Sequence, residues 1–135
     1  GHCFVLQPRG TTGYCHRIIC AQDYSAVTAA CMLVKKSAFD QVGGLTEELA
    51  VAFNDIDFCM KLRAAGYLIV YNPYAELYHY EPKSRGQEDT PEKVARFNKE
   101  IATFEKRWPD IMRDGDPYYN PNLTLKSQDF SLKRI

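Results

Sequence analysis

Hydrophobic runs in the first two thirds of the chain predict short strands. The near-continuous apolar run AVTAACMLV, over residues 26–34, predicts a strand buried on both faces. The run YLIVY, over residues 67–71, predicts a second strand, which the following Asn-Pro pair stops. Residues 75–81 (AELYHYE) are expected to form a third extended segment, with His79 at its end on the same face as Leu77.

Two short helices are predicted between the first two strands. The first covers residues 37–42, between a serine that suits the N-cap and a pair of glycines. The second covers residues 55–65, with Asn54 as its N-cap and Gly66 after its last turn. Both helices therefore have local start and stop signals.

The polar stretch after the third extended segment changes the pattern. Residues 82–90 contain Pro and Gly and are expected to form a loop. Thr90 and Pro91 then begin a helix whose apolar residues recur at helical spacing to about Arg107, where a Trp-Pro pair ends it. The aromatic tail is expected to pack back as an extended arm. Strands alternating with helices indicate a single α/β domain with a short mixed sheet.

Composition excludes several classes of protein. The 135 residues carry 17 basic and 17 acidic side chains, so no net field favours nucleic acid as a partner. No apolar run is long enough to cross a bilayer. Five cysteines, an odd and scattered set, argue against a disulfide framework and favour the reducing cytoplasm. The pattern Cys15-His16-x-x-x-Cys20 leaves a zinc site as a third-ranked alternative.

Two aspartates open the second predicted helix, and a helical wheel separates them. Asp57 falls on the side opposite to the apolar face and is expected to form a solvated pair with Lys61. Asp55 falls on the apolar face, where a carboxylate needs a partner or a cleft. It either caps a neighbouring loop or pairs with Arg63, or it acts as a general base toward a hydroxyl group.

The order of these features resembles the C-terminal half of family 2 glycosyltransferases with the GT-A fold, especially bacterial enzymes of surface-polysaccharide synthesis. The shared order runs from the Ala29-Ala30 pair through the acidic loop TEE to the amide-Asp pair of FNDIDF. A helix ending in glycine, a strand leading to His79 and the triplet SRG follow, and the tail FEKRWPDIMRDGDPYYNPNLTL is also similar. The resemblance covers about 110 residues and implies that the nucleotide-binding half, with its own D-x-D motif, lies outside this chain.

The resemblance also implies roles for residues on the acceptor side. Asp55 matches the catalytic base, which deprotonates the acceptor hydroxyl for attack on the anomeric carbon with inversion. Ala29, Ala30 and Glu47 match positions that contact the donor or acceptor sugar, and Asn54 stands where the family often has Glu. Asp55 is thus the expected catalytic residue, and the other four belong to the expected substrate-binding residues, together with two residues of the donor side.

On the donor side, the resemblance places His79 at a position that helps to ligate Mg²⁺ or Mn²⁺ in several GT-A enzymes. Lys83 and Arg85 match a loop that closes over the diphosphate. The implied substrates are a nucleotide-diphosphate sugar and a glycan acceptor, and the implied location is the cytoplasm. Peripheral association with the plasma membrane and a homo-oligomer formed through an exposed sheet edge stay open, as does a non-catalytic module that binds carbohydrate or protein.

Overall fold

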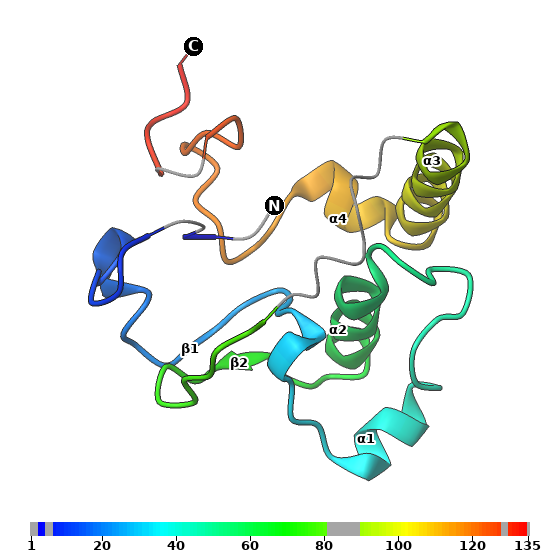
Figure 1. Cartoon of the computed structure of the whole chain (residues 1–135), viewed down its shortest axis with the longest axis horizontal. Helices are drawn as coiled ribbons and strands as arrows, with labels where there is room; N and C mark the ends of the chain where they lie inside the picture. The colour runs from blue at the N-terminus through cyan, green and yellow to red at the C-terminus, as the bar shows by residue number, and fades with distance from the viewer. Residues whose placement is uncertain (1–2, 5–6, 81–89, 128–129, 135) are drawn as a thin grey trace.

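The computed structural model describes residues 3–4, 7–80, 90–127 and 130–134. Figure 1 shows helix α2 near the centre, between the strand pair and α1 on one side and α3 with α4 on the other. The α/β class expected from the sequence is confirmed. The elements, in chain order, are the 3₁₀ helix η1 (Tyr14–His16), β1 (Gln22–Asp23), the 3₁₀ helix η2 (Ala29–Cys31), α1 (Lys36–Gln41), α2 (Asn54–Ala64), β2 (Val70–Tyr71), α3 (Pro91–Arg107) and α4 (Pro109–Asp114).

The sheet of the described residues is one antiparallel pair, β1 with β2, in which Gln22 lies opposite Tyr71. The strand predicted for residues 67–71 is thus reduced to its last two residues. The strand predicted for residues 26–34 is wrong, because Ala29–Cys31 forms η2 and its neighbours are irregular. Thr28 caps this turn, since its hydroxyl accepts a hydrogen bond from the Ala30 N–H. Local capping therefore outweighs the β propensity of the apolar run.

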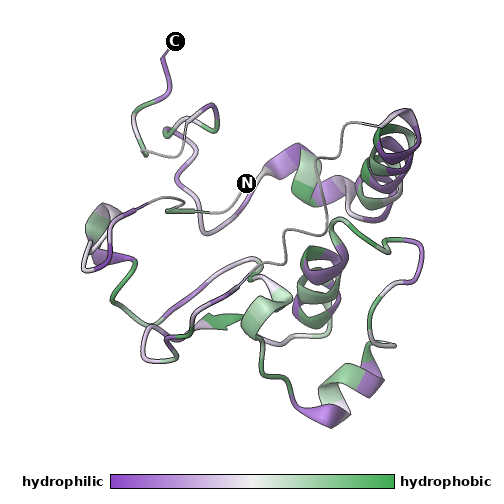
Figure 2. Cartoon of the chain, in the orientation of Figure 1, coloured by the Kyte–Doolittle hydropathy of each residue, from purple (hydrophilic) through white to green (hydrophobic). Residues whose placement is uncertain are grey.

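Helix α2 is buried from two directions. Its Phe58, Cys59 and Leu62 join a core with α1 and Ile69. Its Met60 joins a second core with residues from the preceding loop and from α3. The helix therefore lacks a clean division into one apolar and one polar face, as the mixed colours of α2 in Figure 2 show.

Helix α3 is confirmed over the predicted range. The Thr90 hydroxyl accepts a hydrogen bond from the Lys93 N–H, and Pro91 takes the first helical position. Phe104 lies in the core. Only Trp108 separates α3 from the next helix, because α4 begins at Pro109. This short helix was not predicted.

The C-terminal arm folds back onto the beginning of the chain, as expected. The Phe130 ring stacks on the rings of Phe4 and Tyr14, with centroids 5.0 and 4.9 Å apart. Ser25, in the segment after β1, donates a hydrogen bond to Asp116 and accepts one from Arg63 of α2. The arm is therefore attached to the segment after β1 as well as to the N-terminal segment.

Candidate functional site

The candidate site lies at the N-terminal end of α2. Phe53, directly before the helix, has a φ of 63°, the left-handed region that a bulky residue rarely adopts. Phe53 is the N-cap position and makes no side-chain cap, so the predicted N-cap role of Asn54 is wrong. Asn54 instead occupies the first helical turn.

The Asp55 carboxylate is held by two backbone N–H groups. One oxygen accepts a hydrogen bond from the Ile56 N–H at 2.9 Å, and the other accepts one from the Ala29 N–H at 3.2 Å. The side chain is half-buried, not enclosed in the core. A carboxylate has about four acceptor positions, so the two hydrogen bonds orient Asp55 and leave capacity for a third partner.

This contact joins two segments that the sequence assigned to one site. Ala29 and Ala30 belong to η2 and are exposed, whereas Asp55 is 26 positions further along the chain. The partner of Asp55 is thus the backbone of a neighbouring turn, which is the loop-capping alternative. Arg63, the other candidate partner, donates to Ser25 instead.

The acidic loop is also attached to the first turn of α2. The side-chain oxygen of Asn54 accepts a hydrogen bond from the Thr46 N–H at 3.3 Å. Thr46 is buried, and Glu47, the next residue, is exposed. Asn54 therefore fixes the backbone immediately before Glu47, which brings Glu47, Asn54 and Asp55 to the same end of the helix.

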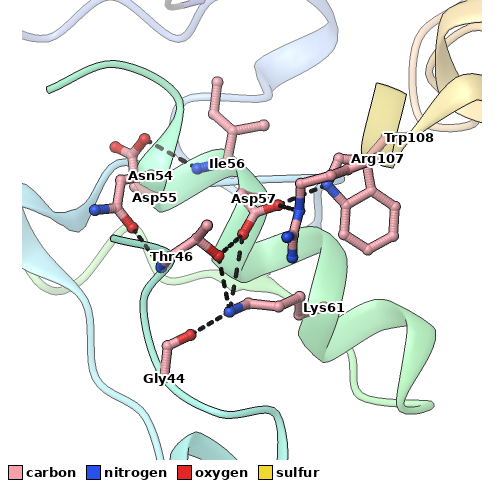
Figure 3. A network of polar contacts seen from close by, with 9 residues as sticks. All are labelled: Gly44, Thr46, Asn54, Asp55, Ile56, Asp57, Lys61, Arg107 and Trp108. Carbon is pink, nitrogen blue, oxygen red and sulfur yellow. Dashed lines mark hydrogen bonds and ion pairs between the residues drawn. The ribbon is translucent and has the colours of Figure 1, made fainter. Parts of the chain in front are cut away.

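Asp57, the second aspartate of the helix, is fully buried at the centre of a polar network (Figure 3). One oxygen accepts hydrogen bonds from Arg107 Nε at 2.9 Å and Trp108 Nε1 at 2.8 Å. The other accepts one from the Thr46 hydroxyl at 2.6 Å. Lys61, four residues along, places its ammonium 3.8 Å from Asp57 and donates to the Gly44 carbonyl.

The network stabilises the charged form of this buried carboxylate. Burial by itself raises the pKa of Asp57, because desolvation disfavours a negative charge. The hydrogen bonds from Thr46 and Trp108 and the positive charge of Arg107 together outweigh that effect, so the net pKa lies below its usual value. The group is therefore a structural anion and not a proton donor or acceptor at neutral pH.

These positions correct the helical-wheel prediction for Asp57, which is expected to be solvated and is fully buried. Asp55 is expected on the apolar face with a partner or a cleft, and it is half-buried with the Ala29 N–H as its partner. The expected ion pair of Asp57 with Lys61 is present, but it is only one part of the larger network. The wheel assumed one buried side, whereas α2 is covered by two cores and by the junction between α3 and α4.

Helix α3 also contacts the turn that precedes α2. Glu100, 3% exposed, accepts a hydrogen bond from the Ala52 N–H at 2.6 Å. The Phe53 ring lies against the rings of Phe97 and Phe104, with centroids 5.6 and 5.4 Å away. A residue with an unfavourable φ persists only where its surroundings hold it, and α3 supplies those surroundings.

Of the donor-side residues, His79 lies in the described part of the chain, and no hydrogen bond or ion pair described there joins it to this end of α2. His79 is exposed, in a segment without helix or strand. Lys83 and Arg85 lie outside the described residues. Within the parts of the chain that the structure describes, no three His, Cys, Asp or Glu side chains are grouped so as to hold a metal ion. His79 alone does not make such a site.

Several residues of the site are not predicted by the sequence patterns. Those patterns indicate only the end of a helix at Arg107 and Trp108, and they give Glu100 no role. The sequence signal for Arg107 and Trp108 is that a charged side chain and one with an N–H group stand together just before a helix-breaking Pro. No local signal points to their partner, because Asp57 is 50 positions away from Arg107.

Comparisons with known proteins relate the chain to glycan synthesis. It is 55% identical over 133 residues to an uncharacterized protein, y4gI, of Sinorhizobium fredii, and that match covers 98% of this chain. It is 32% identical over 136 residues, 99% of the chain, to the O-antigen biosynthesis protein RfbC of Myxococcus xanthus. It is 40% identical over 78 residues, 58% of the chain, to an N-acetylglucosaminyl-diphospho-decaprenol L-rhamnosyltransferase of Mycobacterium tuberculosis.

The chain spans only 14%, 10% and 25% of the lengths of these three relatives, in the same order. No family model matches the chain, and no solved structure matches it either. The similarities support a glycosyltransferase-related protein. Among the described residues, no helix has both the length and the apolar character needed to cross a membrane.

Proposed function

We propose that this chain is the acceptor-side part of an inverting glycosyltransferase of family 2 with the GT-A fold, and that Asp55 is its catalytic base. The substrates are a nucleotide-diphosphate sugar and a hydroxyl of a growing glycan. The nucleotide-binding half of the site belongs to a part of the enzyme that is not in this chain, and residues 1–135 form the C-terminal portion of the glycosyltransferase domain.

In the proposed reaction, Asp55 accepts the proton of the acceptor hydroxyl as the oxygen attacks the anomeric carbon of the donor sugar. A new C–O bond forms on one face of the sugar, and the bond to the nucleotide diphosphate breaks on the opposite face. The configuration at the anomeric carbon is therefore inverted. The proton stays on the Asp55 carboxyl group, and the diphosphate leaves with the electron pair of the broken bond.

The observation that carries the proposal is the geometry of Asp55. Its carboxylate is only half-buried, and backbone N–H groups from α2 and η2 fix its orientation. The contact with Ala29 also brings together segments that the resemblance assigns to one site, although they are distant in sequence. Orientation of a base against its substrate is a large part of what general-base catalysis requires.

The test is to replace Asp55 by Asn in the full-length protein and to measure sugar transfer. A panel of nucleotide-diphosphate sugars should include a rhamnosyl donor, because one relative is named a rhamnosyltransferase. We expect Asp55→Asn to reduce kcat by about 10²- to 10⁴-fold, the usual contribution of a general base. Donor binding, measured by calorimetry, should persist because the amide keeps the shape of the side chain.

A matched control is Asp114→Asn, which removes one aspartate charge at an exposed position at the end of α4. This variant should transfer sugar like the wild type. Transfer at the wild-type rate by Asp55→Asn would remove Asp55 from the proposed role, whatever the control shows.

The complete enzyme is further proposed to use Mg²⁺ or Mn²⁺, with His79 as one ligand and with Lys83 and Arg85 over the diphosphate. The described residues do not form a metal site by themselves. We expect His79→Ala to raise the metal concentration needed for half-maximal activity. An unchanged metal dependence would count against ligation by His79.

The proposed location is the cytoplasm, where nucleotide sugars are the donors and thiols stay reduced. All five cysteines are free in the structure, and Cys15 and Cys20 of the zinc alternative are both exposed. Metal analysis of the purified chain distinguishes that alternative, because bound zinc in one-to-one ratio would support it. Association of the full protein with the inner face of the membrane is a separate proposal, measurable by cosedimentation with anionic vesicles.

A second candidate function is a non-catalytic surface that binds carbohydrate or protein. The observation that favours it is the exposure of tyrosines after β2: Tyr74 is 88% exposed, Tyr78 74% and Tyr80 85%. Aromatic rings exposed in this number often mark an interaction surface. Binding of glycans by Asp55→Asn with wild-type affinity, but no transfer by the wild type, would favour this candidate. Concentration-dependent light scattering would show whether the surface pairs two copies of the chain.

A further inference from the structure

Two buried carboxylates link α2 and α3: one belongs to α2 and is bound by the end of α3, and the other belongs to α3 and is bound by the turn before α2. Asp57, on α2, accepts hydrogen bonds from Arg107 and Trp108 at the C-terminal end of α3. Glu100, on α3, accepts a hydrogen bond from the Ala52 N–H just before α2. Asp57 is 0% exposed and Glu100 is 3% exposed. Buried carboxylates are costly unless they are fully paired, so these two are well-defined features of the fold.

The two links enclose the first turn of α2. Ala52 lies three residues before Asp55, and Asp57 lies two residues after it. The backbone between them is short, and the Asp57 N–H also bonds to the Phe53 carbonyl. Since both ends of residues 52–57 are held by α3 or its C-terminal boundary, the orientation of Asp55 depends on how α3 is seated.

The same network holds the acidic loop. The Thr46 hydroxyl donates to Asp57, and the Thr46 N–H donates to Asn54. Thr46 is thus attached to both sides of Asp55 in the helix. Lys61 adds a further hydrogen bond to the Thr46 hydroxyl oxygen at 3.2 Å. These hydrogen bonds therefore join the loop that carries Glu47 to the turn that carries Asp55.

We propose that Asp57 and Glu100 are positioning residues, which lock the first turn of α2 against α3 and so hold Asp55 in the orientation that faces the acceptor. This inference rests on the proposed role of Asp55 as the base. Neither residue touches a substrate, because both side chains are enclosed by the protein. Their contribution is to keep the carboxylate of Asp55 aligned, and misplacement by about 1 Å can reduce a rate by about 10²-fold.

The experiment uses single substitutions that each remove one hydrogen-bonding group of the network. Thr46→Val and Trp108→Phe each remove one donor to Asp57, and Thr46→Ser keeps the hydroxyl as a matched control. Glu100→Leu removes the acceptor for Ala52, whereas Glu100→Gln keeps an oxygen that can accept the same bond. All of these changes leave the Asp55 side chain itself intact.

Two measurements are made on each variant of the full-length protein: kcat with KM for the nucleotide sugar, and amide hydrogen exchange of residues 53–57. We expect Thr46→Val, Trp108→Phe and Glu100→Leu to lower kcat by about tenfold or more with KM unchanged, and to accelerate exchange. Thr46→Ser and Glu100→Gln should stay near the wild type. Ile69→Val, in the core on the far side of α2, lowers stability and should leave kcat unchanged.

The outcomes separate this inference from the proposed function. If Asp55→Asn transfers sugar normally, the proposed function fails, and hydrogen exchange alone decides whether the two carboxylates fix the turn. If Asp55→Asn is inactive, the inference is overturned when Thr46→Val and Glu100→Leu keep the wild-type kcat. It is also overturned when Ile69→Val lowers kcat as much as they do, because that would indicate a general loss of stability.

Discussion

Replacement of Asp57 by Asn tests whether the buried network stabilises the fold. The side chain keeps its shape, and its oxygen can still accept from Arg107 and Trp108 while its amide donates to the Thr46 hydroxyl. What is lost is the negative charge between Arg107 Nε, at 2.9 Å, and Lys61 Nζ, at 3.8 Å. The effect therefore measures the charge and not the packing.

The structure sets the expected loss in the free energy of unfolding. Removing one partner of a buried ion pair costs about 3–5 kcal/mol. The lower value applies here, because the Arg107 side chain is 39% exposed and is partly solvated without its partner. At about 4 °C per kcal/mol for a domain of this size, a loss of about 3 kcal/mol lowers the melting temperature by about 12 °C.

The contribution of Asp57 to stability depends on pH, and its sign follows from the shift in the Asp57 pKa. The pKa of Asp57 is lower in the folded protein than its usual value of 3.8, so the folded state favours the ionised group. Its contribution to the free energy of unfolding is complete above that usual value, and it is lost as the pH falls through the depressed folded-state pKa. The difference in stability between wild type and Asp57→Asn should therefore be full at neutral pH and should shrink in acid.

The assay is urea unfolding of the chain, followed by far-UV circular dichroism at neutral pH and at several acidic values. Asp114→Asn is the control, because Asp114 also has a lowered pKa, caused by the hydrogen bond from Arg113, but lies exposed on α4. That variant should unfold at the wild-type urea concentration. A loss below about 1 kcal/mol in Asp57→Asn, the value of an exposed pair, would refute the reasoning.

Two further predictions concern the backbone and the thiols. Gly66, after α2, has a φ of 88° and open space where a Cβ atom would lie, so Gly66→Ala should cost about 1–2 kcal/mol from the left-handed backbone alone, seen as a lower urea midpoint. An unchanged midpoint would contradict this. Cys59 is fully buried, and burial raises the pKa of its thiol, whereas the other four cysteines are exposed. A thiol reagent should therefore modify four cysteines quickly and Cys59 only on unfolding. Fast modification of all five cysteines in the folded protein would show that Cys59 is not buried.

The parts of the fold that depend on neighbouring residues were predictable. Thr90 and Pro91 define where α3 begins, because capping and a missing N–H act within one turn. Gly66 follows the end of α2 for a similar reason, since its positive φ suits the residue after a helix. The family resemblance also predicted that Ala29 lies near Asp55, and the Ala29 N–H donates a hydrogen bond to the Asp55 carboxylate.

The roles of the two aspartates depended on residues far away in the sequence. Asp55 and Asp57 have similar local surroundings, and capping chemistry favours both at the start of a helix. Only the packing of α3 brings Arg107 and Trp108, about 50 positions away, to Asp57, whereas Asp55 stays half-buried. The apolar run at residues 26–34 fails as a strand for a local reason, because Thr28 caps a 3₁₀ turn inside it. Local chemistry determined where α3 begins and where α2 ends, and long-range packing decided which carboxylate is fully buried and which is only half-buried.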